Sequence, residues 1–140
     1  MKINRISPIK DKKNYDALVE TESALRYMIV NKDKCKLFNF ITDQHPYAEY
    51  ARINITFFGR QVTTMIGGAA FAVKYKLPLF YLNMSYREDG NYVSKYTKIT
   101  DDASTMSVQE IMDLYYRMLE KDIREQPWNY LWSHNRWRIR

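Results

Sequence analysis

Apolar side chains recur at the three- and four-residue spacing of an amphipathic helix in two stretches, residues 15–31 and 107–125. In the second stretch, Ser107 and Glu110 stand at the spacing of a capping box. Its predicted apolar face comprises Val108, Ile111, Met112, Tyr115, Met118, Leu119 and Ile123. Residues 64–76, which are rich in small side chains, predict a third helix that packs closely on a sheet.

Short apolar runs predict the strands. Residues 36–42 and 78–85 are runs of the kind that a sheet buries on both faces. Residues 88–91 carry a hairpin-turn signal, and residues 92–99 then return as an antiparallel strand. We therefore predict an α/β fold with a short mixed β-sheet covered by three helices, in a single domain over residues 1–140.

Three other segments have weaker patterns. Residues 2–6 alternate charged and apolar side chains and predict a short or edge strand. Residues 47–56 are predicted to be irregular. Phe57, Phe58 and Gly59 combine two aromatic rings with a residue free to adopt positive φ, which predicts a lip over the core.

Length and composition limit the class of protein. A chain of 140 residues can bury a core, and its single cysteine, Cys35, excludes an internal disulfide framework. No apolar run approaches the ~18 to 20 residues that span a bilayer, and the N-terminus has no signal-peptide pattern, so we expect a cytosol-facing chain without a membrane anchor. We expect no metal site or cofactor, because two distant histidines and one cysteine lack ligand spacing.

The formal net charge of +6 favours partners that carry phosphate or acidic groups. Nucleic acid, anionic lipid headgroups and an acidic carrier protein all qualify. Nucleic acid is the weakest candidate, because the sequence has no zinc-finger spacing, no aromatic RNA-binding strand signature and no basic recognition helix.

All three tryptophans, Trp128, Trp132 and Trp137, stand close together near the C-terminus. Rings of this size are usually buried, so they predict a structural tail that packs on an edge of the core. His134 and Arg136 lie among them, and an arginine there suits the binding of a carboxylate or a phosphate.

Asp43 and Gln44 directly follow the strand predicted over residues 36–42. Open α/β sheets bind ligands at the carboxyl ends of their strands, which makes these two residues candidates for a binding site. The same residue types beside a proline turn also serve only to satisfy loop backbone groups. Both interpretations stay open at this point.

The C-terminal segment resembles the Pro-Glu-x-Trp/Tyr-Leu-Trp-x-His-Arg-Arg-Trp ending of the late lipid A biosynthesis acyltransferases, which are similar to lysophospholipid acyltransferases. The matching residues are Pro127, Leu131, Trp132, His134, Arg136 and Trp137. Trp128 replaces the Glu of that pattern, and Asn135 replaces its first Arg. Upstream blocks that follow the family's order are Asp43, Gln44, Pro46, Phe57, Phe58 and Gly59, and a helix that ends near Tyr75 before Pro78. The resemblance covers roughly residues 22–138.

The resemblance implies an acyltransferase that moves an acyl chain from acyl carrier protein to a lipid A precursor at the cytoplasmic face of the inner membrane. Asp43, Gln44, His134 and Arg136 are the residues that we expect to bind substrate, and we assign no catalytic residue. Such a family uses a His-x4-Asp/Glu motif, in which a carboxylate orients a general base.

Neither histidine of the chain is followed by an acidic residue at the spacing of this motif. Tyr50 stands five residues after His45, and Ile139 stands five residues after His134. Glu49 could pair with His45 on a helix, but the loop composition disfavours a helix there. We therefore expect the isolated chain to be inactive and to correspond to the C-terminal portion of such an enzyme, as a truncated, split or degenerate copy. The competing interpretation is a non-catalytic module whose basic aromatic surface binds anionic lipid or a partner subunit, such as a missing N-terminal half.

Overall fold

The computed structural model describes residues 19, 21–34, 36–46, 52–133 and 136. The chain forms two compact units, residues 1–39 and residues 40–140. The prediction of a single domain over the whole chain therefore stays a prediction.

Among the described residues of the first unit, Thr21–Asn31 form helix α2. It ends where the side-chain amide of Asn31 donates to the carbonyl of Tyr27 over 2.7 Å. This helix confirms the later part of the helix predicted over residues 15–31. Val19, which the prediction placed in this helix, is not helical. Residues 15–18 and 20 of the predicted helix, and the strand predicted over residues 2–6, lie outside the described residues.

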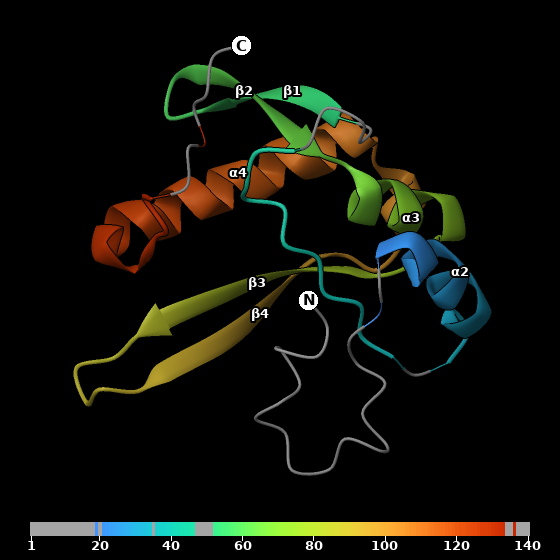
Figure 1. The fold of residues 1–140 in the computed structure, drawn as a ribbon, viewed down its shortest axis with the longest axis horizontal. Coiled ribbons are helices and arrows are strands. Elements are labelled where there is room, and N and C mark those ends of the chain that lie inside the picture. The colour runs from blue at the N-terminus through green and yellow to red at the C-terminus, as the bar shows by residue number, and fades with distance from the viewer. Residues whose placement is uncertain (1–18, 20, 35, 47–51, 134–135, 137–140) are drawn as a thin grey trace. The chain divides into compact units, whose positions relative to one another are not determined.

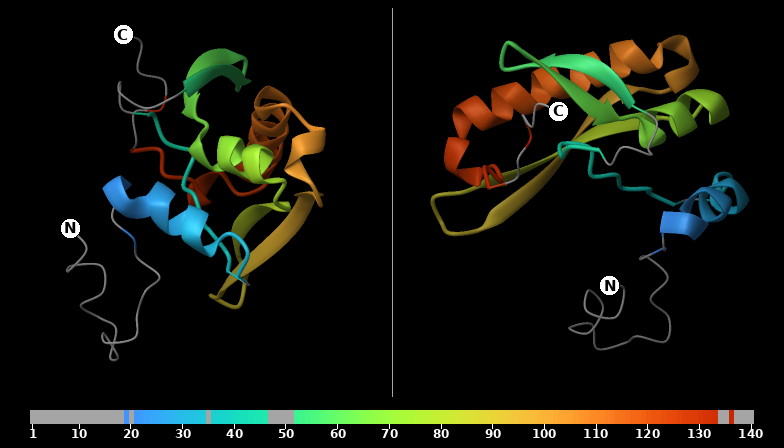
Figure 2. Two further views of the ribbon diagram at one scale, coloured as in Figure 1. Left: turned by 90° about the vertical axis from the view of Figure 1, so that its right-hand side faces the viewer. Right: turned by 45° about the horizontal axis from the view of Figure 1, so that its top comes forward.

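The second unit is built around helix α4, Val108–Glu125. A hairpin of strands β1 (Arg52–Phe57) and β2 (Arg60–Met65) lies on one side of α4. A second hairpin, of strands β3 (Leu79–Tyr86) and β4 (Tyr92–Thr100), lies on the other side (Figure 1; Figure 2). The α/β class with three helices is thereby confirmed.

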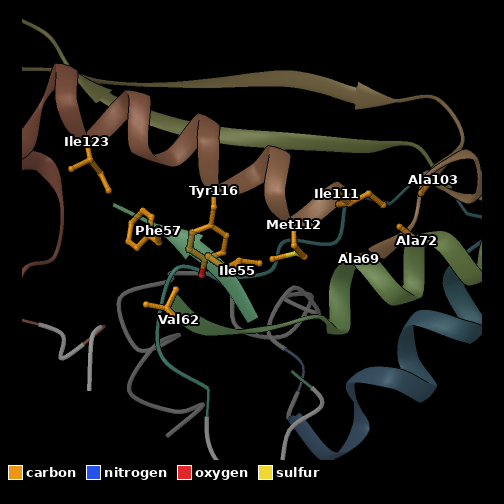
Figure 3. Packing of buried hydrophobic residues seen from close by; sticks show 10 residues of the cluster. All are labelled: Ile55, Phe57, Val62, Ala69, Ala72, Ala103, Ile111, Met112, Tyr116 and Ile123. Carbon is orange, nitrogen blue, oxygen red and sulfur yellow. The ribbon is translucent and has the colours of Figure 1, made fainter. Parts of the chain in front are cut away.

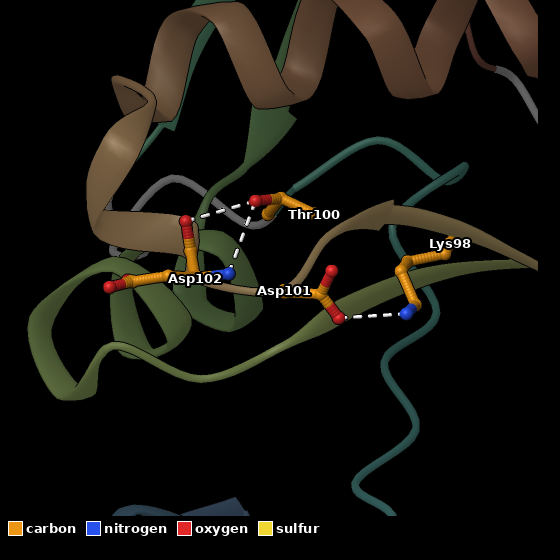
Figure 4. A network of polar contacts seen from close by, with 4 residues as sticks. All are labelled: Lys98, Thr100, Asp101 and Asp102. Carbon is orange, nitrogen blue, oxygen red and sulfur yellow. Dashed lines mark hydrogen bonds and ion pairs between the residues drawn. The ribbon is translucent and has the colours of Figure 1, made fainter.

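Helix α3, Gly67–Tyr75, follows β2 and contacts α4. Two short 3-10 helices flank α4: η1 (Ala103–Thr105) before it and η2 (Pro127–Asn129) after it. At η1, the side chain of Asp102 accepts from the backbone N–H of Ser104, and the backbone N–H of Asp102 donates to the hydroxyl of Thr100. Lys98 and Asp101 form an ion pair of 2.7 Å beside this turn, so polar contacts fix the path from β4 into α4 (Figure 4).

Helix α4 confirms the prediction over residues 107–125, including its capping box. The Ser107 side chain accepts from the backbone N–H of Glu110, and the Glu110 carboxylate accepts from the backbone N–H of Ser107. The core lies between α4, the β1–β2 hairpin and α3 (Figure 3). Its buried members are Ile55, Phe57, Val62, Ala69, Ala72, Ala103, Ile111, Met112, Tyr116 and Ile123.

The β1–β2 hairpin corrects two predictions. Residues 52–56 are not irregular but belong to β1, and residues 64 and 65 belong to β2 rather than to a helix. The physical reason is a period of two: Ile55 and Phe57 point into the core while Asn54 and Thr56 point outward, and β2 alternates in the same way. Gly59 adopts positive φ, as predicted: Phe58 and Gly59 form a two-residue turn with φ values of 49° and 71°.

The β3–β4 hairpin confirms the strands predicted over residues 78–85 and 92–99 and the turn between them. The sheets differ from the prediction, because the described residues form two separate antiparallel hairpins instead of one mixed sheet. Strand β3 is also covered on one face only. Tyr81 faces α4 and is 5% exposed, whereas Met84 on the opposite face is 55% exposed.

Strand β3 is attached to the end of α4 by side chains. The Tyr81 hydroxyl donates to a carboxylate oxygen of Asp122 over 2.5 Å. The side-chain amide of Gln126 accepts from the backbone N–H of Tyr86 and donates to its carbonyl. These contacts hold one face of the hairpin against α4.

The strand predicted over residues 36–42 is wrong. The described residues of this segment form no strand, and Ile41 is 70% exposed. An apolar run becomes a buried strand only when a neighbouring strand supplies its hydrogen bonds. Here the Thr42 carbonyl is instead bound by side chains, which brings this segment into the site below.

Candidate functional site

The side chain of Arg136 is buried inside the second unit, with an exposure of 1%. Its guanidinium carbon lies 5.3 Å from the centre of the Tyr116 ring and 5.9 Å from that of Phe57. Nη2 donates to the Tyr116 hydroxyl over 2.7 Å. Nε and Nη1 have no hydrogen-bond partner among the described residues. A buried cation with two unpaired donors is costly, which marks this position as more than core packing.

Tyr116 links Arg136 to the segment that precedes Asp43. Its hydroxyl donates to the Thr42 carbonyl over 2.8 Å and lies 3.0 Å from the hydroxyl of Thr64. Tyr116 and Thr64 are both fully buried. Tyr116 follows Met112 by one helical turn on the face of α4 that points toward β1 (Figure 3), and the alternation of β2 turns Thr64 inward with Val62.

A second tyrosine holds the next carbonyl along the chain. The Tyr130 hydroxyl donates to the backbone carbonyl of Asp43 over 3.4 Å, and the Tyr130 ring packs edge-on against Phe57. Two phenols from different parts of the chain therefore bind two successive carbonyls. The side chains of Asp43 and Gln44 are half-buried directly after this anchor.

Charges of opposite sign act on these two phenols. Burial is the largest cause that raises the pKa of Tyr116, and it raises the pKa of Tyr130 to about 12. In both residues the positive charge of Arg136 lowers the pKa and the negative charge of Asp43 raises it. Arg136 and Asp43 thus share one electrostatic environment, although the described residues contain no ion pair between them.

The structure brings together two of the predicted substrate-binding residues, Asp43 and Arg136, and places Gln44 beside the first. His134 lies outside the described residues. Sequence reasoning missed Tyr116, Tyr130 and Thr64. The signal for Tyr116 was its spacing of four residues from Met112, and a phenol on an apolar helix face needs a partner for its hydroxyl.

The tryptophan tail is corrected in its described part. Trp128 and Trp132 are 71% and 50% exposed, so neither ring is buried in the core; Trp137 lies outside the described residues. The indole N–H of Trp132 donates to the Pro127 carbonyl, and its ring packs edge-on against Tyr130. Among the described residues, local contacts within the tail therefore replace the expected packing on a core edge.

The described part of the chain contains no group of three or more metal-ligating side chains. In the same ranges, no helix has the length and apolar character needed to cross a bilayer.

Fold and site together define an α/β protein in which a buried arginine and an acidic loop meet at a pair of tyrosines. The family model for bacterial lipid A biosynthesis acyltransferases matches residues 12–139. The chain therefore belongs to this family, as the C-terminal motif indicated, and family membership supports an acyltransferase function in lipid A biosynthesis. Comparisons with curated proteins and with solved structures gave no match.

Proposed function

We propose that this chain takes part in the transfer of an acyl chain from acyl carrier protein to a hydroxyl of a lipid A precursor, at the cytoplasmic face of the inner membrane. The family match over residues 12–139 is the observation that carries this proposal. The net charge of +6 supports it, because both the acidic carrier protein and a phosphorylated lipid would be attracted.

In this reaction the hydroxyl oxygen of the acceptor attacks the thioester carbonyl. A carbon–oxygen bond forms and the carbon–sulfur bond breaks. The hydroxyl proton passes to a general base, which returns it to the departing thiolate so that the carrier leaves as a thiol. Neither His45 nor His134 has the spacing of the His-x4-Asp/Glu motif. We assign substrate binding, not proton transfer, to Asp43, Gln44 and His134. The Arg136 side chain, at 1% exposure, offers no accessible donor to a substrate, so the substrate-binding role expected for it from the sequence is not proposed.

The first experiment is an acyl transfer assay of the purified 140-residue chain with an acyl carrier protein thioester and a lipid A precursor. We expect no turnover by the chain alone, because neither histidine has the spacing of the motif. Turnover that His45→Ala abolishes would overturn this expectation and would make His45 the base.

The second experiment measures binding of the lipid A precursor in detergent micelles. Asp43→Asn should weaken binding several-fold if the loop contacts substrate. Glu88→Gln, an exposed position in the β3–β4 turn, is the charge-matched control and should bind like the wild type. Equal affinity of all three proteins would remove Asp43 from the binding site.

A second candidate function is a non-catalytic module that binds anionic lipid or a partner subunit. The exposed face of the β3–β4 hairpin favours it, because large apolar and aromatic side chains lie there together. They are Phe80, Leu82, Met84, Tyr86, Tyr92 and Tyr96. Binding to anionic vesicles and to single-stranded oligonucleotides, at low and at moderate salt, tests this candidate. Preference for vesicles, reduced by Leu82→Ser, supports a lipid-facing surface, and a salt-steep preference for oligonucleotides contradicts it.

A further inference from the structure

Arg136 is too deeply buried to act as a direct substrate clamp in this conformation. Its side chain has 1% exposure, and the hydrogen bond that it makes within the described residues goes to the Tyr116 hydroxyl. A guanidinium that binds a carboxylate or phosphate of a substrate uses its planar fork of donors at an accessible edge. The role of Arg136 must therefore be sought in what Tyr116 contacts.

The backbone leading to Asp43 is held by side chains instead of by a β-ladder. The Thr42 carbonyl accepts from Tyr116, and the Asp43 carbonyl accepts from Tyr130. Upstream, the ring of Phe40 lies against Gly68, where an added Cβ would come within 2.8 Å of ring atoms. These three anchors set the path of residues 40–43, and with it the place where the Asp43 and Gln44 side chains emerge.

Arg136 determines the direction of the most buried of these anchors. A phenol has one O–H donor and can accept two hydrogen bonds. Arg136 donates to the Tyr116 oxygen, which leaves the single Tyr116 proton for the Thr42 carbonyl, 2.8 Å away, or for the Thr64 hydroxyl, 3.0 Å away. Thr64 in turn donates to the Thr42 carbonyl over 3.3 Å, so the Tyr116 proton secures this carbonyl directly or through Thr64.

We infer that Arg136 is a positioning residue, which orders the Asp43–Gln44 loop through the Tyr116 hydroxyl. The inference rests on the proposed function, in which this loop binds substrate. It assigns Arg136 a role that needs one donated hydrogen bond and no contact with the substrate.

The test compares backbone order in the loop across four variants of the full 140-residue chain. Tyr116→Phe removes the hydroxyl and keeps the ring, and Arg136→Met removes the donor and keeps the volume. Arg136→Lys restores a single donor without the planar fork. Tyr81→Phe is the matched control, because it deletes another buried phenol hydroxyl that bonds to Asp122, away from the loop.

NMR order parameters of the Asp43 and Gln44 amides are the readout, with urea unfolding of each variant as a check on global stability. In the wild type and in Tyr81→Phe we expect values of about 0.85, and in Tyr116→Phe and Arg136→Met values below about 0.6. Arg136→Lys should return the loop to the wild-type range. Unchanged order parameters in both Tyr116→Phe and Arg136→Met would overturn the inference. Low order parameters in Arg136→Lys would overturn it as well, because the loop would then depend on the planar guanidinium and not on a single donor.

Binding of the lipid A precursor in micelles separates this inference from the proposed function. Loss of one ordinary hydrogen bond should weaken binding about tenfold. If Tyr116→Phe and Arg136→Met lose order in the loop and bind the precursor about tenfold more weakly, the positioning role and the assignment of this loop to substrate binding both stand. If the loop loses order and binding is unchanged, the positioning role stands and the assignment of this loop to substrate binding fails.

Discussion

Replacing Arg136 by methionine tests whether this residue contributes to stability or costs it. The side chain is 1% exposed, and only Nη2 among its nitrogens has a hydrogen-bond partner in the described residues. Methionine has a similar length, is flexible and carries no charge, so it can fill the same volume beside Phe57 and Tyr116. We expect Arg136→Met to leave the free energy of unfolding unchanged or to raise it.

The magnitude is set by two opposing effects of the guanidinium on stability. The variant gives up one hydrogen bond from a charged donor, worth about 1.5 to 3 kcal/mol, and cation–π interactions worth about 0.5 to 2 kcal/mol. It also removes two unpaired buried donors, each of which costs about 1 to 3 kcal/mol. The Tyr116 hydroxyl can donate to the Thr64 hydroxyl in the variant, so it stays satisfied even where its bond to the Thr42 carbonyl weakens. The two effects are similar in size, so we expect a change between zero and about 3 kcal/mol in favour of the variant.

Urea unfolding followed by far-UV circular dichroism measures this difference. Arg124→Met on the exposed side of α4 is the matched control, because that guanidinium also lies over an aromatic ring, Phe58, but is solvated. The control should change stability by no more than about 0.5 kcal/mol. Destabilisation of Arg136→Met by about 3 kcal/mol or more would refute the reasoning, since it would mean that the buried guanidinium is fully paired in solution.

Three further predictions concern the helix cap, the buried phenols and the tail. Ser107→Ala should destabilise the fold by about 1 kcal/mol in urea unfolding. Hydrogen bonds from Ser107 lower the pKa of Glu110. The contribution of this carboxylate to folding stability should therefore be complete above its ordinary pKa of 4.5 and should be lost as the pH falls through its lower folded pKa. Tyr130 should ionise near pH 12 in an NMR titration, and Asp43→Asn should lower that pKa; because its pKa in the unfolded chain is near 10, the stability that this phenol contributes should decline between about pH 10 and pH 12. Trp132→Ala should lower folding stability by less than about 2 kcal/mol in a thermal melt, because half of this side chain is already exposed. A loss as large as that for truncation of a buried aromatic ring would show that the Trp132 ring is buried in solution.

The elements with a strong local signal could be predicted from the sequence. Helix α4 has a capping box and a continuous apolar face, and both operate within the helix itself. The β3–β4 hairpin has a turn at Gly90, where φ is 86°, between two runs that favour strands. In both cases the information lies within a few residues of the element that it specifies.

The hairpin of β1 and β2 was missed although its alternation is present in the sequence. The turn of Phe58 and Gly59 lacks the Asn-Gly or Asp-Gly signal that usually marks a two-residue loop, and Phe58 at φ 49° is an uncommon conformation for an aromatic residue. Glu120 on α4 accepts from the backbone N–H of Phe58. A contact 62 residues away along the chain therefore supports the turn, and no local pattern could report it.

The candidate site was predictable in its charged members and not in the groups that connect them. Asp43 and Arg136 drew attention because an acid after an apolar run, and an arginine among aromatic rings, are unusual in themselves. Nothing in the local sequence distinguishes Tyr116 and Thr64 from other residues of a helix and a strand. Their role is recognised only once the fold brings the Thr42 carbonyl to both hydroxyls. Their role depends on segments 22 and 74 residues from Thr42, and only the tertiary fold brings those segments together.

The failed strand prediction over residues 36–42 and the candidate site have the same physical origin. A backbone carbonyl that leaves water must find a donor, and in a strand the neighbouring strand supplies it. At Thr42 and Asp43 the donors are the hydroxyls of Tyr116 and Tyr130, which fix the chain without fixing a β conformation. Side-chain anchors of this kind leave Asp43 and Gln44 half-buried at a defined position, which a ladder continuing through them would not do. Local sequence rules are expected to fail where function imposes its own geometry, and under the proposed function residues 40–44 are such a segment.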